Sequence, residues 1–259
     1  MKEKTVELKN LSIGYFISKE RKSILPPINA TIYSGELTCL LGANGIGKST
    51  LLRTLSAFQP AINGKILIKG KDISDFSVRE LSSVIGVVLT DKTELKNMTV
   101  TELVGMGRNP HTGFWGKLNG LDKKIISEAI RSVNIDKLAM RMIHTLSDGE
   151  RQKVMIAKAL AQETDIIFLD EPTAFLDFPS KIEIMQLLRR LSKESGKTIF
   201  LSTHDLELAL QIADKLWLMD KDGVKTEIPD DLFQKDADCS FFQYPGCYFD
   251  RISRSFRIN

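Results

Sequence analysis

Alternating apolar and polar positions mark the beginning of the chain. The alternation covers residues 6–11 and 28–32, and a further short apolar segment spans residues 66–68. A period of two places one side chain in the core and the next in solvent, which is the pattern of a strand with one exposed face. We therefore expect a small antiparallel β subdomain here, with Tyr15 at a turn after Gly14.

The middle of the chain changes to a helical period. A continuous apolar run at residues 85–89 is typical of a buried strand, and apolar residues then recur at helical spacing with no further strand pattern before residue 166. This pattern predicts a helical insert over about residues 91–164. The helices expected within it span residues 101–107, 123–133 and 149–162.

Strand and helix patterns alternate in the last third of the chain. Such alternation indicates a parallel sheet that is covered by helices. The predicted strands span residues 166–170, 198–202 and 216–219, and the predicted helices span residues 181–194 and 206–213.

A glycine-rich loop joins another predicted strand to a helix. Residues 37–41 are largely apolar, and residues 49–55 have helical spacing. The loop between them leads into Lys48-Ser49. Its glycines let successive backbone N–H groups turn towards an anion, and the helix N-terminus adds partial positive charge. The spacing Gly-x-x-x-x-Gly-Lys-[Ser/Thr] is that of a loop that binds nucleotide phosphates. The residues expected to contact the nucleotide here are Gly42, Ala43, Asn44, Gly45, Ile46, Gly47, Lys48, Ser49 and Thr50.

Two carboxylates stand at the end of the predicted strand that begins at residue 166. Asp170 can hold Mg²⁺ together with the Ser49 hydroxyl, and Glu171 can orient the water that attacks the terminal phosphate. Acidic pairs at strand ends also cap helices, so the pair alone does not decide between the two roles. The phosphate loop upstream favours the catalytic role, with a nucleoside triphosphate and Mg²⁺ as cofactors.

The loop and the element pattern together predict an α/β fold. We expect a P-loop NTPase core with a largely parallel sheet, an antiparallel β subdomain and a helical insert. One nucleotide-binding domain is predicted over residues 1–228, followed by a tail at residues 229–259 whose role the sequence does not indicate.

Composition excludes several classes of protein. Charged residues make up 27% of the chain and the net charge is only +3, which gives no support to nucleic-acid binding. The apolar runs are far shorter than the roughly 18 residues of a membrane-spanning helix, and the charged beginning has no signal-peptide core. The three cysteines lack metal-binding spacing, which favours reduced cytoplasmic thiols.

A family resemblance becomes specific at residues 146–150, Leu-Ser-Asp-Gly-Glu. Ser147 is a plausible N-cap of the next helix, and Gly149 permits a close backbone approach. ATP-binding subunits of ABC transporters carry the signature Leu-Ser-Gly-Gly-Gln in this place, and the chain resembles them over about residues 5–225.

The resemblance implies further site residues. Tyr15 matches the family's aromatic residue that stacks on adenine, and residues 174–177 match the family's D-loop. His204 matches the switch histidine that senses the γ-phosphate, so Glu171 and His204 are the implied catalytic residues. The family's mechanism has two copies that close head to tail on two ATP molecules, with Ser147 and Gly149 of one copy on the nucleotide held by the other.

Three positions depart from the family pattern. Asp148 and Glu150 replace a glycine and the glutamine of the signature, and they add carboxylates near the expected phosphate. Thr90 stands where the family's glutamine contacts Mg²⁺ and the attacking water. A threonine hydroxyl can still bind the metal at a shorter reach, so we keep Thr90 with Ser49 and Asp170 as expected metal ligands. The two carboxylates can also point away from phosphate, where they suit the helix dipole.

Residues 99–111 resemble the corresponding segment of importers for iron-siderophores, haem and vitamin B12. The shared features are a Val-x-Glu-Leu-Val run and a later Gly-Arg-x-Pro. The resemblance implies integral-membrane permease partners, an indirect link to a substrate-binding protein, and a peripheral location on the cytoplasmic face of the inner (plasma) membrane. We expect permease docking at residues 90–115, where the candidate contact residues are Met98, Met106, Arg108, Phe114 and Trp115.

Two alternatives to an active importer subunit stay open. One is a nucleotide-gated clamp that hydrolyses ATP poorly, because the departures fall where hydrolysis and closure are controlled. The other is a soluble ABC ATPase that acts on ribosomes or DNA, although such proteins generally carry two of these domains or long coiled inserts. We expect neither nucleic-acid binding nor a cargo site in this chain.

Overall fold

A computed structural model describes residues 3–17, 20–89, 97–113, 116–234, 247–250 and 255–258. Its first part is a four-stranded antiparallel sheet in the order β4-β1-β6-β7. The strands are β1 (Lys4–Ser12), β4 (Ile28–Tyr33), β6 (Asn63–Ile68) and β7 (Lys71–Asp72). The sheet confirms the β subdomain that the alternating positions predict.

A separate hairpin of β2 (Gly14–Ile17) and β3 (Glu20–Ser23) corrects the prediction for Tyr15. This residue lies within β2 and pairs with Lys22 across the hairpin, so it is not at a turn. Gly14 is required by the close approach of the strands, because a Cβ atom there would lie 1.9 Å from the Lys22 carbonyl oxygen.

The second sheet has six strands in the order β12-β11-β5-β10-β9-β8. Neighbouring strands from β11 to β8 are parallel, and β12 pairs antiparallel to β11 at the edge. This is the largely parallel core that the sequence predicts. The strands are β5 (Leu37–Gly42), β8 (Ile85–Val88), β9 (Ile166–Leu169), β10 (Thr198–Thr203), β11 (Lys215–Asp220) and β12 (Gly223–Glu227).

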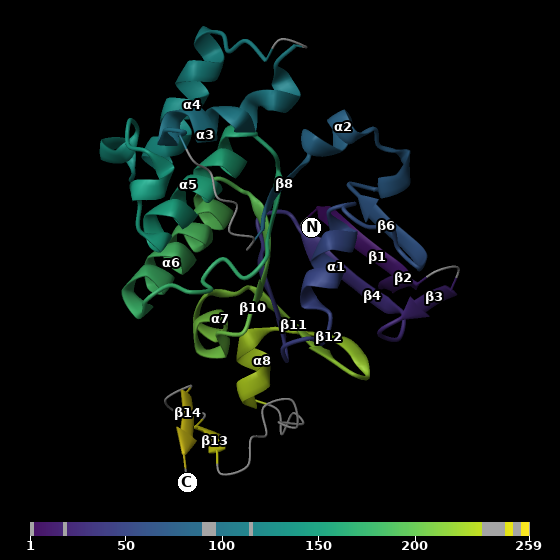
Figure 1. The fold of residues 1–259 in the computed structure, drawn as a ribbon. Helices are drawn as coiled ribbons and strands as arrows, with labels where there is room; N and C mark the ends of the chain where they lie inside the picture. The colour runs from purple at the N-terminus through teal and green to yellow at the C-terminus, as the bar shows by residue number, and fades with distance from the viewer. Residues whose placement is uncertain are drawn as a thin grey trace.

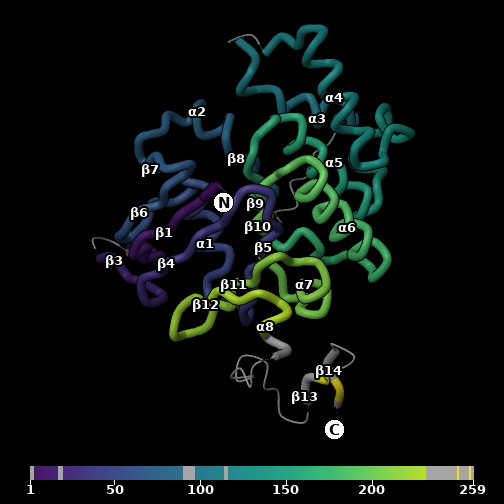
Figure 2. The backbone as a smooth tube through the Cα atoms, turned by 180° about the vertical axis from the view of Figure 1, so that it is seen from behind, coloured from purple at the N-terminus to yellow at the C-terminus, as the bar shows by residue number. Residues whose placement is uncertain are grey.

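The helices divide between the two faces of the parallel sheet. α1 lies on the face that is turned towards the antiparallel sheet, and α3 to α7 lie on the opposite side (Figures 1 and 2). These helices are α1 (Lys48–Leu55), α3 (Val100–Gly105), α4 (Gly120–Ser132), α5 (Asp148–Ala161), α6 (Phe178–Glu194) and α7 (Leu206–Ile212). Short elements that the sequence does not predict are α2 (Val78–Ser82), α8 (Pro229–Gln234), β13 (Cys247–Asp250) and β14 (Ser255–Ile258).

Each parallel strand divides its side chains between two apolar clusters. On β10, Ile199 and Leu201 pack with the helices α3 to α7, whereas Phe200 packs with α1 and the antiparallel sheet. Phe200 also contacts the Phe168 and Trp217 rings edge-on, at centroid distances of 5.9 and 4.9 Å. Burial on both faces accounts for the continuous apolar runs of these strands and fixes the positions of their carboxyl ends.

The predicted helical insert is present, and its details differ from the expectation at Arg108. After α3 the chain continues as a 3₁₀ helix over Met106–His111, and this places Arg108 inside the protein at 3% exposure. Its Nε atom donates to Asp122 Oδ1 at 3.0 Å, and Nη1 donates to the Ala161 carbonyl and to Glu163 Oε2 at 2.7 and 2.6 Å. Arg108 therefore joins this 3₁₀ helix to α4 and to the end of α5, and it is not part of a docking surface.

The described residues contain no helix that is both long and apolar enough to span a membrane.

Candidate functional site

The phosphate loop lies between the end of β5 and the start of α1. Gly45 and Gly47 have φ angles of 76° and 117°, and residues that carry a Cβ atom rarely adopt such angles. Gly42 is needed for a different reason, since a Cβ atom there would lie 2.7 Å from the Met219 carbonyl oxygen on β11. Ala43 and Asn44 are exposed beside them. The glycines thus let this loop turn its backbone N–H groups towards an anion at the N-terminus of α1.

Lys48 is the buried cation of the loop. Its side chain is 5% exposed, and Nζ donates to the carbonyl oxygens of Gly42 and Ala43 at 2.8 and 3.2 Å. Burial lowers the pKa of Lys48, and the carboxylates of Glu171 and Asp170 oppose this shift. A cation that is held within the loop in this way is positioned to contact the outer phosphates of a nucleotide.

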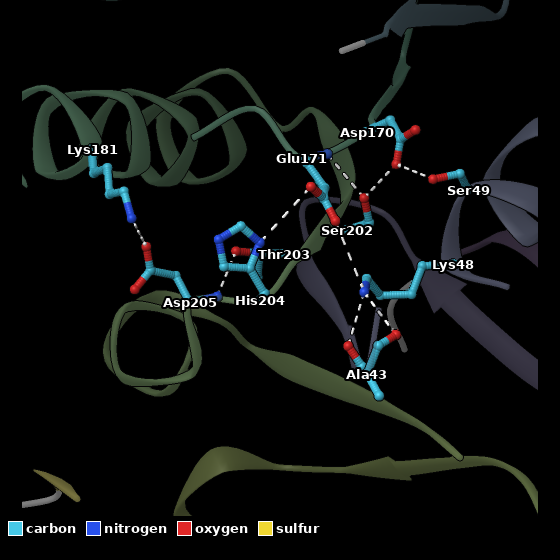
Figure 3. A network of polar contacts seen from close by, with 11 residues as sticks. Ala43, Lys48, Ser49, Asp170, Glu171, Lys181, Ser202, Thr203, His204 and Asp205 are labelled. Carbon is cyan, nitrogen blue, oxygen red and sulfur yellow. Dashed lines mark hydrogen bonds and ion pairs between the residues drawn. The ribbon is translucent and has the colours of Figure 1, made fainter. Parts of the chain in front are cut away.

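A carboxylate and two hydroxyls meet where the parallel strands end (Figure 3). Asp170 follows β9 and is 8% exposed, and its Oδ1 atom accepts from Ser49 at 3.1 Å and from Ser202 at 2.6 Å. Oxygen ligands of this kind are the ones that Mg²⁺ prefers, so the expected pairing of Ser49 with Asp170 has the required chemistry. No pattern in the sequence indicates Ser202, because its contact with Asp170 depends on β10 lying beside β9.

The Glu171 carboxylate lies between Lys48 and His204 (Figure 3). Its Oε1 atom lies 3.8 Å from Lys48 Nζ, and its Oε2 atom lies 3.8 Å from His204 Nδ1. The Glu171 backbone has a φ of 43° and its N–H donates to Ser202 Oγ at 2.9 Å. Ser202 therefore contacts both acidic residues. This arrangement brings together Glu171 and His204, as the resemblance implies.

Tyr15 approaches the phosphate loop from the β2–β3 hairpin. Its hydroxyl lies 2.9 Å from Thr50 Oγ1 on α1, and the residue is 51% exposed. A half-exposed aromatic residue next to the loop suits stacking on a nucleotide base. Thr50 itself is buried, and its side chain contacts Tyr15.

Ser147 and Gly149 lie at the start of α5. Ser147 Oγ accepts from the Glu150 N–H at 3.3 Å, and the Glu150 carboxylate accepts from the Ser147 N–H at 2.9 Å. Glu150 is therefore engaged in a capping box, as expected for a carboxylate in the first helical turn. Asp148 is exposed beside it. Thr90, the third expected metal ligand, lies outside the described residues.

These side chains together define a class of protein. One edge of the parallel sheet carries three features: a phosphate loop, a hydroxyl–carboxylate pair suited to Mg²⁺, and a second carboxylate beside a histidine. This combination is that of a P-loop protein that binds and hydrolyses a nucleoside triphosphate.

The comparisons with known proteins identify the family. A family model described as ABC transporter matches residues 25–174. An uncharacterized ABC transporter ATP-binding protein of Methanocaldococcus jannaschii is 44% identical over 214 residues, which cover 83% of this chain and 72% of that protein. The iron(3+)-hydroxamate import ATP-binding protein FhuC of Bacillus subtilis is 38% identical over 244 residues, 90% of this chain and 89% of FhuC.

A solved structure adds a relative with bound products. It is a dimeric ATP-binding cassette in a post-hydrolysis state with ADP and Pi, 29% identical, with a TM-score of 0.74 over 86% of this chain and 98% of that one. This chain belongs to the ABC transporter family, as an ATP-binding subunit with ATPase activity.

Proposed function

We propose that this chain is the ATPase subunit of an importer for iron chelates of the siderophore type, with residues 1–228 as its nucleotide-binding domain. The similarity to FhuC over 90% of the chain supports the substrate class. The observation that carries the catalytic part of the proposal is the position of Glu171, between Lys48 and His204 and next to the Asp170–Ser49 pair. The cargo itself would be contacted by other subunits.

In this proposal the residues at the sheet edge have separate roles. The backbone N–H groups of residues 42–50 and the Lys48 ammonium bind the phosphates, and the Tyr15 ring stacks on adenine. Ser49, Asp170 and Thr90 would hold Mg²⁺, which neutralises phosphate charge when it is bound. Glu171 orients the attacking water, and His204 contacts the γ-phosphate.

The proposal also includes a second copy of the chain. The cassette solved with ADP and Pi is a dimer, and the Ser147 end of α5 presents an exposed hydroxyl and a helix N-terminus. A helix N-terminus favours an anion, so Ser147 and Gly149 of one copy suit the γ-phosphate bound by the other. Hydrolysis would then remove the group that holds the two copies together.

Membrane partners complete the proposal. The relatives named as import ATP-binding proteins support integral-membrane permease subunits as partners, with a substrate-binding protein acting through them. We therefore propose a peripheral location at the cytoplasmic face of the inner membrane. The exposed side chains of Met106, Met140 and Met142 in the helical region offer apolar contact area for a permease, in place of the buried Arg108.

Substitution of Glu171 tests the catalytic core of this proposal. Glu171→Gln keeps the size of the side chain and removes the charge that orients water, so turnover should fall at least about 100-fold while ATP affinity stays within about 3-fold. ATP should then trap a dimer, which sedimentation can detect. Glu128→Gln on the exposed face of α4 is the matched control and should behave as the unmodified protein.

Turnover near the unmodified rate in Glu171→Gln would refute the assignment of Glu171. A mutant that binds ATP, loses turnover and stays monomeric would refute the dimer. Slow turnover in the unmodified protein together with an ATP-dependent dimer would favour the alternative of a nucleotide-gated clamp.

A further inference from the structure

An ion pair next to the catalytic edge joins the start of α6 to the loop that carries His204 (Figure 3). Lys181 Nζ lies 2.6 Å from Asp205 Oδ2, and the two side chains are 22% and 25% exposed. Lys181 lies in the first turn of α6, where its N–H donates to the Asp177 carbonyl, and Asp205 directly follows His204. The pair therefore connects a helix that begins shortly after Glu171 with the residue next to the switch histidine.

The Asp205 carboxylate contacts a neighbouring helix and does not cap its own. It is the N-cap residue of α7, where an aspartate ordinarily accepts a hydrogen bond from the first helical turn. The Asp205 side chain makes no such bond, whereas Asp177 at the start of α6 does cap its own helix. The Asp205 carboxylate is thus directed across to α6, away from the helix that it begins.

The backbone on both sides of His204 is held by these contacts. The Thr203 side chain is buried and its Oγ1 accepts from the Asp205 N–H at 3.0 Å, while the His204 carbonyl accepts from the Leu206 N–H at 3.1 Å. The His204 side chain itself is 49% exposed and meets Glu171 only at the longer distance of 3.8 Å. The imidazole is therefore held only weakly by its own contacts. The direction in which it points depends on the backbone that the Thr203 and Asp205 contacts hold in place.

We propose that Lys181 is a positioning residue for His204, acting through its ion pair with Asp205. The pair holds the His204 loop against α6, so that the imidazole faces Glu171 and the γ-phosphate. This inference rests on the role proposed above for His204. A partly exposed ion pair contributes little to global stability, so its loss should change the rate of hydrolysis more than the fold.

The test compares three substitutions at two similar ion pairs. Lys153 on α5 pairs with Glu183 on α6, also at 2.6 Å and with a lysine that is 21% exposed, but this pair does not reach the His204 loop. Lys181→Met should lower kcat about 10-fold and leave the KM for ATP within about 2-fold, because the bound nucleotide keeps its loop contacts. Lys181→Arg keeps the charge and should retain kcat, and the control Lys153→Met should also retain it.

A spectroscopic measurement reports the position of His204 directly. The chain has three histidines, so a His204→Gln sample identifies the His204 imidazole signal in a magnetic-resonance spectrum. Lys181→Met should shift this signal and leave those of His111 and His144 in place, whereas Lys181→Arg should shift none of them.

Two results would overturn the inference. One is an equal loss of kcat in Lys181→Met and Lys153→Met, which would indicate general loosening of α6. The other is an unchanged His204 signal in Lys181→Met. Failure of the proposed function would give a different result, namely full turnover in His204→Gln. In that case the His204 signal of Lys181→Met, compared with that of the unmodified protein, would still show whether Lys181 positions the loop.

Discussion

The catalytic edge of the parallel sheet and the Ser147 end of α5 differ in where their side chains find partners. At the sheet edge, Asp170 contacts hydroxyls from α1 and β10, and Glu171 lies between Lys48 and His204. At the start of α5, Ser147 and Glu150 bond to each other within one helical turn. The first region assembles groups from distant segments into the proposed phosphate site, while the second caps its own helix and presents an exposed N-terminus.

This difference indicates how the work is divided in the proposed mechanism. One chain supplies the residues that bind the phosphates, the metal and the attacking water. The Ser147 end adds a positive helix terminus that suits the nucleotide of a second copy. Changes in the two regions should therefore affect different steps, with ATP affinity sensitive to the first and dimer formation to the second.

The largest expected effect is the difference in ATP affinity between Lys48→Ala and Ser147→Phe. Lys48→Ala removes the buried cation of the loop and should weaken ATP binding about 1,000-fold, or about 4 kcal/mol. Ser147→Phe should leave the ATP affinity of the single chain within about 3-fold, because in the proposed dimer Ser147 faces the nucleotide that the other copy binds. Equilibrium binding of a fluorescent ATP analogue measures both.

In the Glu171→Gln background, Ser147→Phe should also prevent the ATP-dependent dimer, and the exposed Lys124→Ala should change neither binding nor dimerisation. A loss of ATP affinity in Ser147→Phe comparable to that in Lys48→Ala would place both regions in one site of one chain.

Arg108→Met tests whether the helical region can be weakened independently of the phosphate site. It leaves Asp122 buried without its cation, so the free energy of unfolding should fall by about 3 kcal/mol in a denaturant titration. The ATP affinity of the remaining folded protein should stay within about 3-fold. Arg131→Met, at an exposed position on α4, is the control and should change stability by less than about 0.5 kcal/mol. A stability unchanged by Arg108→Met would contradict the buried network.

Arg108 also shows where prediction from the sequence ends. Periodicity predicts the strands and helices, because burial on one face repeats within each element, and the spacing of the phosphate loop predicts its chemistry. The burial of Arg108 depends on Asp122 and Glu163, and the role of Ser202 depends on the pairing of β10 with β9. Contacts of this kind join segments that are far apart in the sequence, and no local period reports them.

The smallest expected effect belongs to Glu150→Gln. Glutamine can still accept the hydrogen bond from the Ser147 N–H, so the capping box is kept, and the substitution removes one negative charge near the expected γ-phosphate. In the Glu171→Gln background the ATP concentration needed for half-maximal dimerisation should fall about 3-fold, or about 0.7 kcal/mol. Glu128→Gln should leave this concentration unchanged. A higher concentration requirement in Glu150→Gln would mean that the carboxylate favours closure.

The most direct measurement is the structure of Glu171→Gln with ATP and Mg²⁺. We expect a head-to-tail dimer in which each γ-phosphate is contacted by Lys48 of one copy and by the Ser147 hydroxyl and Gly149 N–H of the other. We also expect Mg²⁺ on the Ser49 and Asp170 oxygens. A closed site in which a single chain supplies all phosphate contacts, with Ser147 still exposed to solvent, would show that each ATP is not shared between two copies.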